Sequence, residues 1–165
     1  MVIGVTIIIL RLMSATKSNM KTEQIDELEA NSSILLVDDD EPFVRRLGRA
    51  MEKRGFMVNT ALTVSEGKTL ADKLLPGYAV VDLRLEDGSG LEVVELLRSK
   101  RPDSRIVVLT GYGAIASAVA AVKMGATDYL SKPADAVDVM NALLAGKENK
   151  PPPPENPMSA DRVRW

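Results

Sequence analysis

Residues 33–42 read Ser-Ile-Leu-Leu-Val-Asp-Asp-Asp-Glu-Pro, an apolar run that ends abruptly in acidic residues. A short apolar run bounded in this way is typical of a strand buried on both faces, so we expect a strand over Ile34–Val37. Pro42 suits the first turn of a helix. Apolar residues from Phe43 onward follow at helical spacing until Gly55, which predicts the helix end. The stretch therefore predicts one strand followed by one helix.

The same alternation of strand and helix continues through the centre of the chain. Short apolar runs predict further strands, and amphipathic stretches predict further helices. The predicted strands are Phe56–Ala61, Tyr78–Val81, Ile106–Leu109 and Asp128–Leu130, and the predicted helices are Val64–Leu75, Leu91–Lys100, Ile115–Lys123 and Ala136–Leu144. Together they indicate an α/β fold, a doubly wound five-stranded parallel sheet with helices on both faces, formed by a domain over residues 33–146.

The composition restricts the classes of function. The 165 residues are 45% hydrophobic and 27% charged, as in a globular protein with one core. A formal net charge of −2 and a pI near 5.3 give no basic footprint for binding nucleic acid. The chain has no cysteine and no histidine, which excludes disulfides, thiolate metal sites and a Ser-His-Asp triad. The lack of cysteine fits a cytoplasmic location, which we expect.

Both ends of the sequence differ from the alternating centre. Val2–Leu10 is an apolar run about half as long as the roughly 20 residues that span a bilayer, so we expect no direct membrane insertion. We expect residues 1–32 to be an N-terminal extension, which is either disordered or includes, over residues 1–19, a stretch upstream of a true start at Met20. Residues 147–158 include four consecutive prolines and predict a proline-rich linker. Residues 159–165 predict the truncated start of a C-terminal domain.

Chemically active side chains follow the predicted strands. In an open parallel sheet, ligands bind beyond the carboxyl ends of the strands, where the strand order reverses. The residues at these ends are Asp38 and Asp39, then Asp82, Thr110 and Lys132. With the strand order 2-1-3-4-5, the first and third strands are neighbours and their carboxylates converge. Carboxylates about 4 Å apart repel by roughly 4 kcal/mol at an effective dielectric constant near 20, so a cation is required. Oxygen ligands without histidine or cysteine favour Mg²⁺.

Taken singly, each of these residues has a purely structural alternative. Asp82 would serve equally well as a loop residue, Thr110 as a strand end paired to backbone, and Lys132 as a surface lysine. Tyr129 alone is a core aromatic with a solvated hydroxyl. For Asp40, which directly precedes Glu41-Pro42, capping the following helix is the better interpretation. The occurrence of these residue types at one end of successive strands favours a functional site.

Four segments carry a resemblance to a known family. They are Leu35-Leu36-Val37-Asp38-Asp39-Asp40, Val81-Asp82-Leu83-Arg84-Leu85 with Gly88, Gly90 and Leu91, Val108-Leu109-Thr110-Gly111, and Tyr129-Leu130-Ser131-Lys132-Pro133. They resemble the receiver domains of two-component response regulators, over about residues 33–146. The resemblance implies a flavodoxin-like, CheY-like fold that switches a transcriptional output.

The resemblance also implies a role for each strand-end residue. Asp82 would be the phosphoacceptor, which takes a phosphoryl group from a sensor histidine kinase. The implied Mg²⁺ ligands are Asp39 directly, Asp38 largely through water, Asp82, and the main-chain carbonyl of Arg84. The implied phosphoryl-stabilising residues are Thr110 and Lys132, and the implied switch residues are Thr110 and Tyr129.

A narrower resemblance is to the RegA/PrrA/ActR group of global redox-responsive regulators. It rests on Glu41-Pro42-Phe43, Tyr78–Leu85, Leu109–Gly113, Lys132–Asp135 and the tail Pro151–Trp165. It implies a membrane-bound kinase partner of the RegB/PrrB kind. It also implies a Fis-type helix-turn-helix effector of which residues 159–165 are the start, so DNA would be bound only through the missing C-terminal domain. That two copies pair on phosphorylation is a hypothesis.

Three other functions are compatible with an α/β sheet that carries acidic strand ends. The nearest is a stand-alone receiver without DNA output. A Mg²⁺-dependent aspartyl phosphatase of the haloacid-dehalogenase type is disfavoured, because the Asp-x-Asp pattern of that family is followed by Thr or Val, whereas Asp38-Asp39-Asp40 is followed by Glu41-Pro42. A flavin-binding flavodoxin is disfavoured because no phosphate loop rich in serine and threonine follows the first strand. We therefore expect a phosphorylation switch and not a turnover enzyme.

Overall fold

The computed structural model describes residues 31–111 and 115–145. The linker, the start of a C-terminal domain and nearly all of the predicted N-terminal extension lie outside these ranges, as do Tyr112 and Gly113 of the narrower resemblance. None of the helices in residues 31–111 and 115–145 has the length and apolar composition of a membrane-spanning helix.

Five strands form one parallel sheet in the order β2-β1-β3-β6-β7, which confirms the predicted order. The strands are β1 (Ser33–Val37), β2 (Met57–Ala61), β3 (Tyr78–Asp82), β6 (Arg105–Thr110) and β7 (Asp128–Ser131). In the register of β1 and β3, Val37 lies opposite Val81. The residues that follow these two, Asp38 and Asp82, therefore lie side by side at the carboxyl edge of the sheet.

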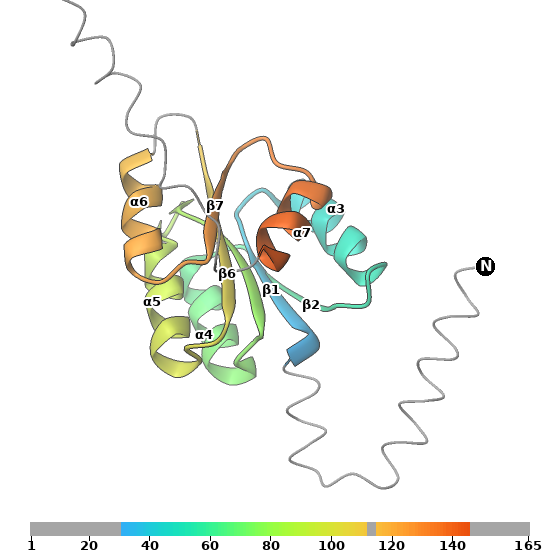
Figure 1. The fold of residues 1–165 in the computed structure, drawn as a ribbon, viewed down its shortest axis with the longest axis horizontal. Coiled ribbons are helices and arrows are strands. Elements are labelled where there is room, and N and C mark those ends of the chain that lie inside the picture. The colour runs from blue at the N-terminus through green and yellow to red at the C-terminus, as the bar shows by residue number, and fades with distance from the viewer. Residues whose placement is uncertain (1–30, 112–114, 146–165) are drawn as a thin grey trace, which may run out of the picture.

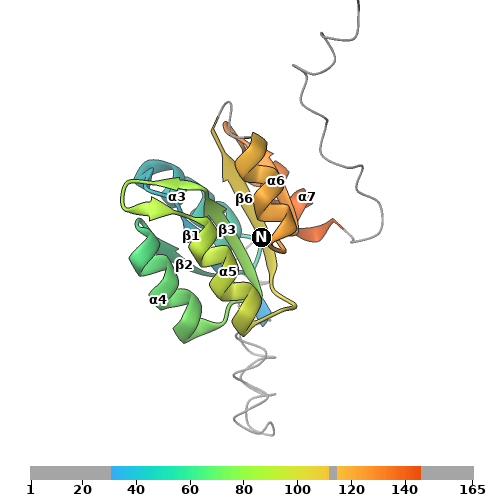
Figure 2. The ribbon, with the colours of Figure 1, turned by 90° about the vertical axis from the view of Figure 1, so that its left-hand side faces the viewer.

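Helices cover both faces of the sheet (Figures 1 and 2). The helices are α3 (Glu41–Glu52), α4 (Val64–Leu74), α5 (Leu91–Lys100), α6 (Ile115–Lys123) and α7 (Ala136–Leu144). Helices α3 and α7 pack on one face, and α4, α5 and α6 pack on the other. This is the doubly wound arrangement that the alternating pattern predicts.

The central strand β1 shows why an unbroken apolar run was needed. All of its residues are buried. Leu35 and Val37 belong to the core cluster beneath α4, α5 and α6, whereas Ile34 and Leu36 belong to the cluster beneath α3 and α7. Successive side chains of a strand point to opposite faces, so a strand between two helical layers must be apolar at every position.

Side-chain caps set where the helices begin. The Asp40 carboxylate accepts a hydrogen bond from the Phe43 N–H at 3.0 Å, which confirms the predicted capping role. Thr63 caps α4 in the same way, and Asp135 caps α7 through a capping box. Because Asp40 caps α3, the turn between β1 and α3 consists only of Asp38, Asp39 and Asp40.

The structure differs from the sequence predictions at a few positions. Helix α4 ends one residue early, because Leu75 adopts the left-handed conformation with φ 44°. A small antiparallel hairpin, β4 (Arg84–Leu85) and β5 (Gly88–Ser89), lies between β3 and α5 and was not predicted. Glu86 and Asp87 form the two-residue loop between these strands, and Gly88, the first residue of β5, has a positive φ of 153°. The strands themselves are too short to show any periodicity.

Candidate functional site

Three carboxylates meet at the carboxyl edge of the sheet. Ligand oxygens of Asp38, Asp39 and Asp82 all lie within 4.8 Å of one another. Asp38 and Asp82 are buried, with 2% and 5% of their surface exposed, whereas Asp39 is exposed. At 4.8 Å each pair of charges repels by about 3.5 kcal/mol at an effective dielectric constant near 20. The cluster therefore requires positive charge nearby.

Lys132 supplies part of that charge. Its Nζ lies 2.6 Å from Asp38 Oδ2 and 2.9 Å from Asp82 Oδ2. The ammonium also lies 5.4 Å from the centre of the Phe43 ring, which adds a cation–π contact from α3. With three carboxylates and one ammonium, the cluster keeps a formal charge of −3 + 1 = −2. One divalent cation would balance this charge.

The protonation equilibria follow from the burial of these groups. Burial raises the pKa of Asp38 above its ordinary value, and the nearby Asp82 charge adds to this, although contacts with Lys132 and the Asp40 N–H act in the opposite direction. Burial alone would lower the pKa of Lys132, but its contacts with the two aspartates outweigh this and raise it. The lysine is therefore held in its charged form.

The aspartate oxygens differ in their hydrogen-bond partners. Asp38 Oδ1 accepts from the Asp40 N–H at 2.9 Å, and Asp82 Oδ1 accepts from the Arg84 N–H at 3.1 Å. Asp38 Oδ2 is buried, and its described partner is the Lys132 ammonium at 2.6 Å. Buried carboxylate oxygens that lie close to other carboxylate oxygens fit a hard divalent cation.

The remaining predicted site residues lie around this cluster. Thr110 is buried at the end of β6, and its carbonyl accepts from the Lys132 N–H at 2.8 Å, so the threonine and lysine stand on adjacent strand ends. Tyr129, in β7, is partly buried against the core cluster beneath α4, α5 and α6. Arg84 lies in β4 with an exposed side chain, and its backbone N–H binds Asp82.

Gly90 is a structural requirement of the site, although the sequence analysis named it only as part of the family resemblance. A Cβ atom built on Gly90 would lie 1.9 Å from the carbonyl oxygen of Asp82 and 2.8 Å from Val81 Cγ1. The Gly90 N–H also donates to the Leu83 carbonyl at 3.1 Å. Only glycine allows the chain to fold back this closely against the end of β3. The contact of Phe43 with Lys132 was not predicted, because the two residues are far apart in the sequence.

Comparison with known proteins assigns the family. Residues 34–144 match the model of the response regulator receiver domain. The chain belongs to this family. It is 70% identical over 146 residues to the photosynthetic apparatus regulatory protein RegA of Cereibacter sphaeroides, covering 88% of this chain and 79% of that protein. It is 55% identical over 152 residues to the acid tolerance regulatory protein ActR of Rhizobium meliloti, covering 92% of this chain and 78% of that protein.

A solved structure supports the same assignment. A response regulator protein from Burkholderia pseudomallei, crystallised with a phosphorylated aspartic acid, a calcium ion and citrate, superimposes with a TM-score of 0.66. It is 37% identical to this chain, and the match covers 79% of this chain and 72% of that one. The fold and family predictions are thereby confirmed.

Family membership defines the function at a general level. This receiver belongs to a two-component regulatory system and is homologous to the transcriptional response regulators RegA and ActR. Response regulators are signalling switches, and the partner implied for a receiver is a histidine kinase. Receiver domains bind a divalent metal at an acidic pocket, which corresponds here to the cluster of Asp38, Asp39 and Asp82.

Proposed function

We propose that Asp82 is the phosphoacceptor of this receiver and that its resident cation is Mg²⁺. The observation that carries the proposal is the meeting of three carboxylates with the Lys132 ammonium at one edge of the sheet. Asp82 Oδ1 is occupied by the Arg84 N–H, whereas Oδ2 faces Lys132. Oδ2 is therefore the oxygen available for attack, and the lysine stands where the incoming phosphoryl oxygens would lie.

The metal ligands follow from the same geometry and from the family resemblance. Exposed Asp39 would bind Mg²⁺ directly, and buried Asp38 would bind it largely through water. Asp82 and the main-chain carbonyl of Arg84 would complete the protein ligands. Bound Mg²⁺ neutralises negative charge on the oxygens of a transferring phosphoryl group. The net charge of −2 on the cluster and the oxygen-only ligands support this assignment.

In the transfer step, the Asp82 carboxylate attacks the phosphorus of a kinase phosphohistidine in line. A new oxygen–phosphorus bond forms as the phosphorus–nitrogen bond breaks, and the imidazole leaves with its electron pair. Lys132 then pairs with a phosphoryl oxygen instead of the free carboxylate. Hydrolysis of the acyl phosphate releases inorganic phosphate and resets the switch, so the chain acts as a switch and not as a turnover enzyme.

The switch would run from Asp82 to the last strands of the sheet. Phosphorylation adds acceptor oxygens that would bind the Thr110 hydroxyl and Lys132, drawing the ends of β6 and β7 inward. Thr110 and Lys132 already share a backbone hydrogen bond, so their movements are coupled. Tyr129 would then change rotamer and bury its ring more deeply. The surface read by a partner would be formed by α6, β7 and α7.

The wider organisation is part of the same proposal. A receiver over residues 33–146 would follow an extension over 1–32 and precede a linker over 147–158. A helix-turn-helix effector, beginning within 159–165, would make all contacts with DNA. The high identity to RegA supports a redox-linked, membrane-bound kinase of the RegB/PrrB kind, acting on this receiver in the cytoplasm.

Intact-mass spectrometry after incubation with acetyl phosphate and Mg²⁺ tests the phosphoacceptor. The wild type is expected to gain one phosphoryl group, roughly 80 Da, which is absent in EDTA and in Asp82→Ala. Asp72→Ala, which removes an exposed carboxylate on α4, is the control and should gain the same mass. An adduct that persists in Asp82→Ala, or that forms equally well in EDTA, would contradict the proposal.

Pairing of two copies is tested separately by size-exclusion chromatography. We expect earlier elution after treatment with acetyl phosphate and Mg²⁺, and no change in Asp82→Ala treated in the same way. Identical elution of the phosphorylated and unphosphorylated wild type would contradict pairing through the face formed by α6, β7 and α7.

A further inference from the structure

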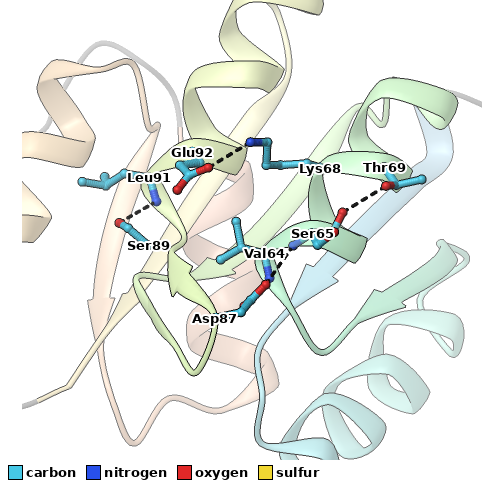
Figure 3. A network of polar contacts seen from close by, with 8 residues as sticks. All are labelled: Val64, Ser65, Lys68, Thr69, Asp87, Ser89, Leu91 and Glu92. Atoms are coloured by element: carbon cyan, nitrogen blue, oxygen red, sulfur yellow. Dashed lines mark hydrogen bonds and ion pairs between the residues drawn. The ribbon is translucent and has the colours of Figure 1, made fainter.

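The β4–β5 hairpin is tied to α4 by the side chain of Asp87 (Figure 3). Asp87 Oδ1 accepts from the Val64 N–H at 2.8 Å, and Oδ2 accepts from the Ser65 N–H at 3.1 Å. These residues begin α4, where backbone N–H groups have no partner within the helix. A carboxylate there also interacts favourably with the helix dipole. Asp87 therefore caps a helix to which it does not belong.

Helix α4 has caps of its own. Thr63 Oγ1 accepts from the Glu66 N–H at 3.1 Å, and the Glu66 carboxylate accepts from the Leu62 N–H at 3.0 Å. This reciprocal pair resembles a capping box and suffices to start a helix. What Asp87 adds is a connection between the helix and the hairpin.

The hairpin needs that connection because it is small and exposed. Each strand has two residues, and a hairpin of this size is not stable alone. Leu85 is buried, and Gly90 packs against the end of β3 just before α5 begins. The tip of the hairpin, formed by Glu86, Asp87 and Gly88, is exposed. Of the hydrogen bonds described for this part of the chain, those of Asp87 attach the tip to another element.

The same hairpin carries part of the functional site. Arg84 opens β4, pairs with Ser89 across the hairpin, and donates its backbone N–H to Asp82 Oδ1. A tilt of the hairpin would therefore move the Arg84 backbone relative to the three carboxylates. Asp87 holds the opposite end of the hairpin from this point.

We infer that Asp87 is a positioning residue of the metal site, which sets the affinity for the cation by holding the Arg84 backbone against the carboxylate cluster. The inference rests on the proposed function, in which the Arg84 carbonyl is a metal ligand. The hydrogen bond from the Val64 N–H, with that from the Ser65 N–H, holds the pKa of Asp87 below its ordinary value. The Asp87 carboxylate that joins the hairpin to α4 is therefore charged at neutral pH. Residues that orient metal ligands commonly change affinity by about 10- to 100-fold when they are removed.

Calorimetric titration of the full chain with Mg²⁺ tests the inference. We expect Asp87→Ala to bind Mg²⁺ about tenfold more weakly than the wild type. Asp87→Asn retains one acceptor oxygen and should fall between the two. In the acetyl phosphate reaction, the variants should need more Mg²⁺ for half-maximal rate but reach the wild-type rate at saturation, because the chemical groups are intact.

Lys68→Met is the matched control. It breaks the 2.9 Å ion pair between Lys68 and Glu92, which also links α4 to the segment after the hairpin, but leaves the bonds of Asp87 in place. Its Mg²⁺ affinity should equal that of the wild type even if its melting temperature falls.

Two outcomes would overturn the inference in distinguishable ways. If Asp87→Ala lost thermal stability but bound Mg²⁺ like the wild type, Asp87 would be a helix cap only, and the proposed function would stand. If the wild type itself neither bound Mg²⁺ nor gained a phosphoryl group, the proposed function would fail and the inference with it. If Asp87→Ala does not fold, the Mg²⁺ affinity of Asp87→Asn decides between positioning and capping.

Discussion

Replacing Asp82 by asparagine is expected to stabilise the metal-free protein. The amide keeps the shape of the side chain and an acceptor for the Arg84 N–H, but removes one charge. Two carboxylate pairs within 4.8 Å contribute at least about 7 kcal/mol of repulsion at an effective dielectric constant near 20. The attraction between Asp82 and Lys132 at 2.9 Å contributes about 6 kcal/mol on the same basis. The balance therefore favours the variant by at least about 1 kcal/mol.

Thermal unfolding in EDTA and in Mg²⁺ measures this balance. A gain of about 1 kcal/mol raises the melting temperature of a domain of this size by roughly 4 °C. In saturating Mg²⁺ the order should reverse, because the wild type is stabilised by the bound cation and the variant has lost an anionic ligand. Asp72→Asn, which loses only an exposed ion pair with Lys100, should stay within about 0.5 kcal/mol of the wild type in both conditions.

The result in EDTA decides whether the charge balance is correct. A melting temperature of Asp82→Asn at or below that of the wild type would refute the calculation, because attraction to Lys132 would then exceed the repulsion. A rise that persists unchanged in saturating Mg²⁺ would refute the assignment of the cluster as a metal site.

Three further predictions concern stability. Gly90→Ala should lose about 3 kcal/mol in urea denaturation, because its Cβ would lie 1.9 Å from the Asp82 carbonyl oxygen; wild-type stability would contradict this packing. Asp135→Ala should lose about 1 kcal/mol in the same assay through loss of the α7 capping box, and an unchanged midpoint would show that the cap is not formed. Because the pKa of Asp87 is depressed below 3.8, its stabilising effect is present above that pH and is lost as the pH falls through the depressed value. The difference in melting temperature between the wild type and Asp87→Asn should therefore disappear well below pH 3.8. A difference independent of pH would contradict stabilisation by the charged Asp87 carboxylate.

Local patterns in the sequence were enough for much of the fold. The unbroken apolar run of β1 indicates that both faces of the strand are buried, because a strand between two helical layers has no face exposed to water. The cap at Asp40 was predictable because the partners in a cap are only three residues apart. The carboxylate cluster followed from the strand order, since parallel strands end at one edge of the sheet.

The missed features depend on contacts between distant residues. The hairpin strands are two residues long, and so carry no periodicity to detect. The bonds of Asp87 to α4 span 22 and 23 residues, and the contact of Lys132 with Asp82 spans 50. No spacing along the chain predicts such contacts, because they depend on how the loops bring the ends of different strands and helices together.

The sequence by itself determined the α/β class and which residue types stand at the carboxyl ends of the strands, because hydrophobic periodicity and capping are local properties of the chain. Only the tertiary structure decided how these side chains share their partners. It placed the Lys132 ammonium between Asp38 and Asp82, pressed Gly90 against the end of β3, and attached the hairpin to α4. The physical reason is that charge balance and close packing depend on distances of a few ångströms between segments far apart in sequence.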